Sequence, residues 1–345
     1  MQIEQELSKI TSEVHPLILK FVAWKVHNAG RSKRTAEAYT AALTRFSGFL
    51  GGRDLLLATV DDTNLFGGLW LHKQGVNNVS RKPYIAAVRE FYKWLRATKQ
   101  ISTDPAAGMV YPQTGRKLPA MMTLASAEAI MWAPDFSTFK GVRDSAILSL
   151  LLGCGLRRDG VAALNTSSLV QQEHKGDTRF ILHVIEKGNK ERTMPVPREV
   201  DMVLRLYLEH EYLATVDRTL PDGDQVLFIS TNNMMVPAHE YTGERRRLAP
   251  KAIWEIVRKH GKSAGVPAKQ LHPHALRHLY GTELLESDVD LLVRQELMGH
   301  ADPKSTSIYT HLAMRKKMAE NDRGNPLAKI RTPVGDLISK LKKPR

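Results

Sequence analysis

The apolar positions of the first hundred residues recur with a helical period. Between residues 32 and 52 they are spaced by four, three and four positions, and the same spacing returns between 80 and 100. Such spacing places apolar side chains on one side of a helix. The first stripe is formed by Tyr39, Leu43, Phe46 and Leu50, and the second by Tyr84, Val88, Phe91 and Leu95. With weaker helical segments at 15–28 and 61–73, the pattern predicts a small bundle of four helices.

After residue 120 the pattern becomes mixed. An almost uninterrupted apolar run predicts a buried helix, and two short runs around a Gly-Asn turn predict a β-hairpin. The expected elements, in chain order, are the buried helix from 143, a turn near 153–155, a second helix up to 169, hairpin strands at 179–185 and 192–197, a strand at 225–230, a helix at 249–265 and mostly helix from 274 to about 320. The predicted fold class is therefore mainly α with a small antiparallel β-sheet.

Proline and glycine mark the boundary between these two patterns. Residues 104–119 are rich in both and show no periodicity, so they are the best candidate for a linker. The predicted division is a helical domain at 14–105, a linker at 106–119, a mixed α/β domain at 120–320 and a basic tail at 321–345.

Charge is distributed unevenly over the 345 residues, whose formal net charge is +14. Residues 1–100 contain 15 Lys and Arg against 8 Asp and Glu, and residues 312–345 contain 10 against 3, while the middle is neutral. Two basic ends suit a protein that binds a polyanion with separate parts, although a generically basic protein would have the same total.

Basic side chains also gather at the starts of two predicted helices, where N–H groups favour phosphate. Solvated turns are the alternative interpretation. The candidate DNA contacts are Arg31, Lys33, Arg34, Thr35, Arg81 and Lys82, together with Lys190 on the hairpin.

Composition points to the cytoplasm. The one cysteine, Cys154, cannot form an internal disulfide, and we expect it to be a small core residue. No run approaches the roughly 18 apolar residues of a membrane span, and the N-terminus lacks the pattern of a secretory signal.

The segment HPHALRH, residues 272–278, combines three histidines with one arginine. A helix that begins after Pro273 would place His274, Arg277 and His278 on one side. The two histidines have the spacing of a metal-binding pair, but no glutamate accompanies them and the charge of Arg277 would oppose a metal ion. We therefore expect no metal here, and taken alone the segment could be the polar start of an ordinary helix.

Four other segments carry related chemistry in a fixed order. Arg157 follows a Gly-Cys-Gly turn, Lys187 stands in EKGNKE, His300 ends LMGH, and Tyr309 follows nine residues later. With HxxR at 274–277, the set resembles the tyrosine recombinase (phage integrase) family, which has these five elements in this order. The likeness covers about 14–311 and is to the core-site type, similar to Xer-like recombinases.

The resemblance implies a SAM-like core-binding domain and a catalytic domain that together clamp duplex DNA. It implies Tyr309 as the nucleophile, Arg157 and Arg277 on the phosphate oxygens, His274 assisting at the tyrosine and phosphate, His300 bonded to the phosphate and Lys187 as the general acid. It further implies a 3′-phosphotyrosyl intermediate, no metal or cofactor, a homotetramer at synapsis, and a bacterial, phage or mobile-element protein associated with the nucleoid when bound. His272, His278 and His311 are expected to be supporting or structural.

One position departs from the family pattern. A carboxylate usually stands three residues after the first arginine, where this chain has Gly160, and Asp159 is the neighbouring candidate for that role. Two other functions therefore stay open: a catalytically inactive DNA-binding protein of the same fold, and a topoisomerase IB-like enzyme that cleaves and reseals one duplex. The apolar segment VGDLISKL at 334–341 is expected to dock on a neighbouring protomer.

Overall fold

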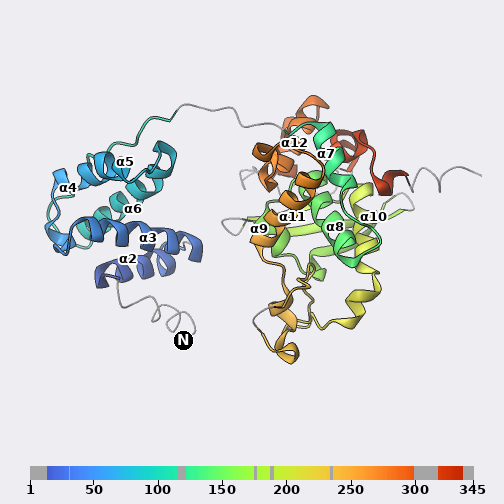
Figure 1. Cartoon of the computed structure of the whole chain (residues 1–345), viewed down its shortest axis with the longest axis horizontal. Helices are drawn as coiled ribbons and strands as arrows, with labels where there is room; N and C mark the ends of the chain where they lie inside the picture. The colour runs from blue at the N-terminus through green and yellow to red at the C-terminus, as the bar shows by residue number, and fades with distance from the viewer. Residues whose placement is uncertain are drawn as a thin grey trace, which may run out of the picture. The chain divides into compact units, whose positions relative to one another are not determined.

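The chain divides into two compact units, residues 1–118 and 119–345 (Figure 1). This computed structural model describes residues 14–30, 32–114, 122–174, 177–186, 190–233, 236–298 and 318–336. Each unit contains its own hydrophobic core, and the predicted fold class is confirmed. Within the described residues, no helix has both the length and the apolar character needed to cross a bilayer.

The N-terminal unit is the predicted helical bundle. Its helices are α2 (Pro16–His27), α3 (Lys33–Phe49), α4 (Val60–Leu65), α5 (Leu71–Lys73) and α6 (Asn78–Ala97), with the wide turn η2 (Phe66–Trp70) between α4 and α5. The Ser32 hydroxyl accepts the N–H of Thr35 at 3.3 Å, which fixes the start of α3. Aromatic rings from α3, η2 and α6 fill the core, where Phe46 and Phe66 meet edge to face at 4.9 Å.

The first part of the predicted linker packs on this unit. Ala106 and Met109 are buried in its core, and Arg89 of α6 donates to the Met109 carbonyl at 2.9 Å. Gly67 of η2 packs closely against this segment, because a Cβ there would lie 2.7 Å from the end of the Met109 side chain. The helix predicted at 61–73 is present as α4 and α5 with the wide turn η2 between them.

The second unit is built around a buried helix, α8 (Phe139–Gly153). The Thr138 hydroxyl accepts the N–H of Gly141 at 3.1 Å and caps its start. Its neighbours are α7 (Leu124–Trp132), α9 (Arg158–Ala162), α10 (Arg198–Leu208), α11 (Pro250–Ser263) and α12 (Pro273–Glu286). These helices cover α8 so fully that all of its residues except one are buried, as its almost continuous apolar sequence predicts.

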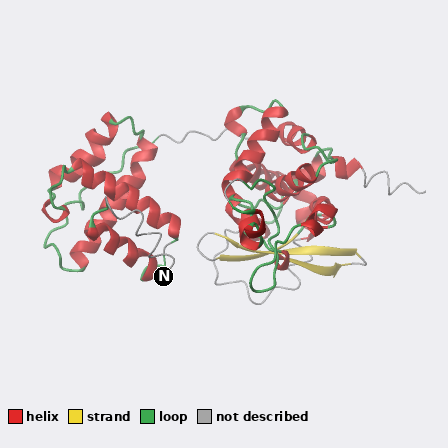
Figure 2. Cartoon of the chain, turned by 60° about the horizontal axis from the view of Figure 1, so that its bottom comes forward, coloured by secondary structure: helices red, strands yellow, loops and turns green. Residues whose placement is uncertain are grey.

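A three-stranded antiparallel sheet lies on one side of these helices (Figure 2). Its strands are β1 (Leu169–His174), β2 (Asp177–Glu186) and β3 (Lys190–Pro195), paired in chain order. The predicted β2–β3 hairpin is confirmed. The strand expected at 225–230 is wrong, because Val226 and Ile229 form only isolated bridges with Asn165 and Arg247.

The helix expected up to residue 169 is also wrong, since α9 ends at Ala162. The segment that follows has polar side chains which bond to the backbone instead. The Ser168 hydroxyl accepts the N–H of Asn165 at 3.1 Å, and the Thr166 hydroxyl donates to the Gln225 carbonyl at 3.2 Å. Such bonds give the backbone an alternative to the helix.

Residues 318–336 pack on the second unit, although the sequence predicts a tail from 321. The Asn321 amide donates to the Pro195 carbonyl at 3.0 Å, and the Asn325 amide donates to the Gly153 carbonyl at 2.6 Å. Val334, the first residue of the segment expected to dock on a neighbour, is buried in the core of its own unit.

Candidate active site

The turn after α8 carries the first candidate, Arg157. Gly155 has a φ of +57°, and a Cβ at this position would lie 2.3 Å from the Tyr280 ring of α12. Glycine is therefore required both by the backbone conformation and by the close approach of α12. Arg157 is half-buried and stands at the N-cap of α9, directly beside this contact.

The start of α12 presents the HPHALRH segment as a capped helix. Nδ1 of His272 accepts the N–H of Ala275 at 3.0 Å, and Pro273 occupies the first helical turn. His272 is thus the N-cap, as expected for a supporting residue. His274 and His278 are exposed, whereas the Arg277 side chain is only 5% exposed.

Arg277 joins two segments that are far apart in the sequence. Its Nη1 donates to the carbonyl of Gly155, and its Nη2 donates to the carbonyl of Met298 at the end of α13 (Leu291–Met298). The structure therefore brings the Arg157 turn, the HxxR helix and the segment before His300 to one place.

The electrostatic environment at the start of α12 is positive. His274 reaches solvent, but the protein around it removes part of the hydration of its imidazole and lowers its pKa below the usual value; the nearby charges of His272, His278, Arg277 and Arg158 lower this pKa further. His274 is consequently neutral at pH 7, so its imidazole can accept a proton there.

The described part of the hairpin ends on either side of the general-acid candidate. Glu186 at the end of β2 pairs with Lys190 at the start of β3, and Lys187 stands between them, outside the described residues. His300 and Tyr309 also lie outside the described residues, as does Arg31. The roles of these side chains stay predictions.

Gly160, the departure from the family pattern, is buried at the wall of a cavity. The cavity has a volume of about 440 Å³ and is also lined by His183, Glu191 and Thr193 of the hairpin. The neighbouring Asp159 is exposed and forms an ion pair with Arg158, with 3.4 Å between Nε and Oδ1.

The candidate DNA contacts of the N-terminal unit fall into two groups. Lys33 and Arg34 are exposed at the start of α3, and the Thr35 hydroxyl lies 3.0 Å from that of Ser32. Arg81 and Lys82 are instead half-buried at the start of α6. Their contacts are the Gly68 carbonyl and Asn78 for Arg81, and the Thr114 hydroxyl at 2.8 Å for Lys82.

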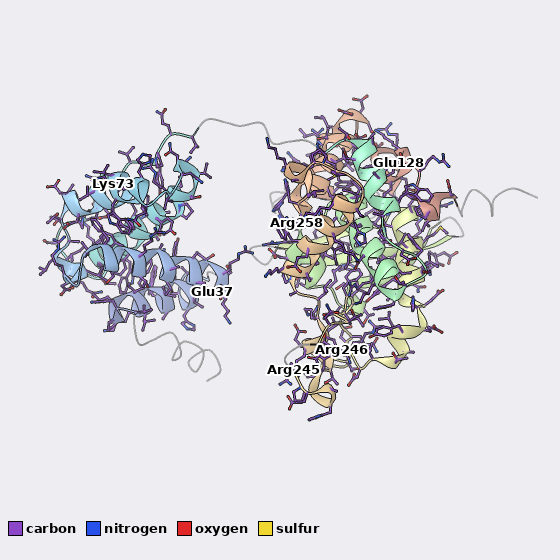
Figure 3. The ribbon with its side chains drawn as sticks, in the orientation of Figure 1. Glu37, Lys73, Glu128, Arg245, Arg246 and Arg258 are labelled. Atoms are coloured by element: carbon purple, nitrogen blue, oxygen red, sulfur yellow. The ribbon has the colours of Figure 1, made fainter. Side chains whose placement is uncertain are left out.

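Some basic residues near the site carried no signal in the sequence. Arg258 lies on α11 (Figure 3), a helix that packs against α9, and its guanidinium stacks over Trp254 at 4.5 Å. Arg192 of β3 is buried and is discussed below. Arg258 belongs to no motif, and Arg192 ends the EKGNKER segment of the hairpin, in which only Lys187 was given a catalytic role. The contacts of these two arginines are therefore known from the structure alone.

The described residues contain no group of three or more His, Cys, Asp or Glu side chains that could hold a metal ion. Cys154, expected in the core, is fully buried, and burial raises the pKa of its thiol to about 12. A thiol with this pKa stays protonated at neutral pH.

Comparison with known families supports the motif assignment over most of the chain. Residues 120–316 match the phage integrase family, and residues 26–99 match the phage integrase N-terminal SAM-like domain. The two matched regions lie in the two separate units of the fold.

Curated relatives align with this chain over most of both lengths. The chain is 31% identical over 309 residues to tyrosine recombinase XerD of Pseudomonas putida, covering 87% of this chain and 93% of the relative. It is 32% identical over 300 residues to tyrosine recombinase XerC of Pseudomonas fluorescens, covering 86% and 92%.

Solved structures agree on the fold. A lambda integrase dimer bound to a COC′ core site aligns with a TM-score of 0.60 at 14% identity, covering 84% of this chain and 95% of that one. The XerH recombinase bound to its difH substrate aligns with a TM-score of 0.57 at 19% identity, covering 80% and 76%. From its motifs, its two units and these relatives, the chain belongs to the phage integrase family of tyrosine recombinases.

Proposed function

We propose that this protein is a site-specific DNA recombinase that cuts and rejoins DNA strands through a covalent 3′-phosphotyrosyl intermediate on Tyr309. The observation that carries the proposal is the position of Arg277. Its two bonds, to Gly155 and to Met298, gather three of the five motif segments around one buried guanidinium. Isolated motif matches on a different fold would not converge in this way.

The two arginines suit the charge that develops in the reaction. When the Tyr309 oxygen attacks phosphorus, negative charge grows on the two non-bridging oxygens. Guanidinium groups stay protonated at any relevant pH and match two oxygens with a planar fork. Arg157 and Arg277 would stabilise this charge without a metal ion.

Proton transfers complete each step. The phenol has an ordinary pKa of about 10, so it must lose its proton as it attacks. His274, which is neutral at pH 7, is placed by the motif to accept this proton or to bind the phosphate. The P–O5′ bond breaks as Lys187 protonates the leaving 5′ oxygen. His300 would donate a hydrogen bond to the phosphate.

The phosphotyrosyl ester conserves the energy of the broken phosphodiester. A 5′-hydroxyl from a second duplex can therefore attack it, release Tyr309 and form the recombinant strand without a cofactor. We propose duplex DNA in the cytoplasm as the substrate, gripped by both units, and a homotetramer as the assembly that aligns two duplexes. The net charge of +14 supports a polyanionic partner.

A covalent-trapping experiment tests this function. Duplexes with a randomised centre are first selected for binding to the full chain. The selected duplexes are then rebuilt with a nick beside each candidate cleavage position, so that the cut strand end diffuses away. A protein–DNA adduct that resists SDS is expected for the wild type, and none for Tyr309→Phe. Tyr111→Phe, a matched change on the N-terminal unit, should form the adduct normally.

The same materials separate the two alternatives. Selected DNA that binds tightly but never forms an adduct would indicate an inactive DNA-binding protein. An adduct together with relaxation of supercoiled plasmid, but without exchange between two labelled duplexes, would indicate a topoisomerase-like enzyme. Adduct formation by Tyr309→Phe would show that the nucleophile is another residue.

A further inference from the structure

Two arginines beside the candidate site join the turn that follows α8 to the end of α13. The turn offers the carbonyls of Cys154, the C-cap of α8, and of Gly155, and the end of α13 offers those of Leu297 and Met298. Arg277 bonds the second carbonyl of each pair, Gly155 and Met298. Arg192 of β3 bonds the first of each pair, with 3.3 Å to the Cys154 oxygen and 2.6 Å to the Leu297 oxygen. The two guanidinium groups therefore bridge the same two segments one residue apart.

We propose that Arg192 is a positioning residue for Arg277: by fixing the distance between the ends of α8 and α13, it sets the carbonyls against which Arg277 is aligned. This inference rests on the proposed function, because Arg277 must meet a phosphate for its alignment to matter. It assigns a role to Arg192, which ends the EKGNKER segment of the hairpin and for which the motifs alone predict none.

The physical reason lies in the ends of the helices. The last carbonyls of a helix, here Leu297 and Met298 of α13 and the C-cap Cys154 of α8, have no partner within it and form the negative end of the helix dipole. Carbonyls from two segments that are held close together repel each other unless cations or N–H donors lie between them. A guanidinium supplies both, and its five donors allow it to bridge two acceptors at once.

Burial makes this bridge specific. Arg192 is 7% exposed, and a buried charge is tolerated only where acceptors surround it. Arg277 is equally buried, and its bonds to the two carbonyls use two of the five donors that a guanidinium carries. If the carbonyls move apart, Arg277 can keep only one of them, and its plane rotates away from the direction that a phosphate requires.

The strand that carries Arg192 is itself well fixed. Arg192 pairs with Val184 of β2, and its neighbours Glu191 and Thr193 are exposed while Met194 is buried. Arg192 thus belongs to the inward-facing row of β3, two positions along the strand from Lys190, whose pair with Glu186 closes the hairpin. The hairpin also carries Lys187, so a change at Arg192 can affect cleavage by two routes: through the alignment of Arg277 or through the general acid Lys187. The experiment has to distinguish these two routes.

DNA substrates with a chemically altered scissile phosphate distinguish an effect through Arg277 from an effect through Lys187. A methylphosphonate removes the charge of one non-bridging oxygen and so reduces the need for the arginines. A 5′-bridging phosphorothiolate has a thiolate leaving group, and because a thiol is far more acidic than a hydroxyl, this group leaves without a general acid. Cleavage rates of Arg192→Met, Arg192→Lys, Arg277→Lys and Lys187→Ala are measured on these substrates and on the normal phosphodiester, using the full chain.

We expect Arg192→Met to cleave the normal phosphodiester about 100-fold more slowly than the wild type, the size of effect that a displacement of about 1 Å produces. Arg192→Lys keeps the charge but can reach one carbonyl at a time, so its loss should be smaller. For both variants and for Arg277→Lys, the loss of cleavage rate relative to wild type should be smaller on the methylphosphonate and unchanged on the phosphorothiolate. For Lys187→Ala, the loss should be unchanged on the methylphosphonate and smaller on the phosphorothiolate.

Other outcomes overturn the inference. A defect that shrinks on the phosphorothiolate would mean that Arg192 acts through Lys187. A defect equal on all three substrates, or no defect, would mean a general structural role. Arg218→Met is the matched control, since Arg218 is also buried and donates to a carbonyl, that of Val226 at 2.8 Å; its effect should be the same on every substrate. If the wild type forms no adduct on the phosphodiester, the proposed function fails first.

Thermal unfolding and duplex binding are measured for each variant, so that a change in cleavage is compared only among folded proteins. If Arg192→Met does not fold, Arg192→Lys is used in its place to test the role of Arg192 in cleavage, because it leaves a cation between the two segments.

Discussion

Arg277 and His274 lie three residues apart on α12, yet they have opposite environments. Arg277 is buried and aligned by two carbonyls, while His274 is exposed among other cations. The two carbonyls fix the direction of the Arg277 guanidinium, and the surroundings of His274 set the protonation state of its imidazole. The helical period puts both residues on the same side of α12, so the difference comes from the segments around them: Arg277 reaches the carbonyls of Gly155 and Met298, while His274, one turn earlier, stays exposed.

At Gly155 we expect substitution by alanine to damage both stability and cleavage. The new Cβ would lie 2.3 Å from the Tyr280 ring, at a φ of +57° that L residues adopt with strain. The strain costs about 1 kcal/mol and the overpacking a further 1–3 kcal/mol of unfolding free energy. Gly265→Ala is the matched control, because Gly265 has a φ of +69° and open space around it. Urea unfolding that gives equal losses for the two variants would contradict the close approach of α12.

At His274 we expect a titration midpoint below 6.5 in the DNA-free protein, because burial and neighbouring cations disfavour the imidazolium. Lowering the pH through this midpoint protonates His274 and removes its capacity to accept a proton, so cleavage should fall on the acid side. NMR of labelled histidine, assigned with His274→Gln, measures the midpoint. A midpoint above 6.5 without DNA would show that the surrounding charges are arranged differently.

Among the elements, α8 is stabilised by a buried polar network as well as by its apolar residues. Asp144 accepts two bonds from Arg143, at 3.1 and 2.7 Å, and lies 2.9 Å from Nε2 of His260 on α11. Arg143 also donates to the Ile229 carbonyl at 3.0 Å. The network therefore joins α8, α11 and the extended segment near 229, and it compensates for the burial of the three charged or polar groups.

We expect Asp144→Asn to lower the free energy of unfolding at pH 7 by about 3–5 kcal/mol, since it leaves the buried Arg143 with a weaker partner. Burial alone would raise the pKa of Asp144, but the bond with His260 and the charge of Arg143 outweigh it and lower that pKa. A carboxyl whose pKa is lowered on folding stabilises the fold above its unfolded pKa of about 3.9. This stabilisation is lost as the pH falls through the folded value.

The difference between wild type and Asp144→Asn should therefore be full at pH 7 and narrow below about pH 4. Urea midpoints at several pH values provide the measurement. Glu244→Gln, which removes an exposed partner of Arg247, should change stability by less than about 1 kcal/mol at any of these pH values. A constant difference between wild type and Asp144→Asn down to pH 3 would contradict the lowered pKa.

At the scale of the whole molecule, charge and domain structure act together. Each unit has its own core, and the N-terminal unit presents Lys33 and Arg34 on its surface. A protein that binds DNA with two separate units contacts more phosphates than either unit alone, so its affinity depends more steeply on salt.

We expect binding of the full chain to a random duplex to weaken about 10³- to 10⁵-fold between 50 and 200 mM salt, as for six to ten phosphate contacts. Lys33→Gln with Arg34→Gln should reduce the log–log slope by about 2. The control variant, Arg96→Gln with Lys99→Gln, removes two charges at the C-terminal end of α6 and just beyond it. It should leave the slope unchanged. Fluorescence anisotropy measures each slope, and equal slopes for the two double variants would exclude the start of α3 from the DNA interface.

Local pattern in the sequence determined the parts of this protein that depend on neighbouring residues. The stripes of α3 and α6, the buried run of α8 and the β2–β3 hairpin were all predicted, because each depends on a period of 3.6 or 2 within one element. The order of the five motifs indicated the family. The predicted helix up to 169 was wrong because polar side chains near Ser168 bond to the backbone.

Only the tertiary structure decided how distant segments meet. The contact between Arg192 and Leu297 spans 105 positions, and that between Arg277 and Gly155 spans 122. No local pattern encodes such contacts, because they depend on the packing of several helices around α8. The roles of Arg192 and Asp144, the packing of residues 106–114 on the first unit and the burial of Val334 in the second follow from that packing alone.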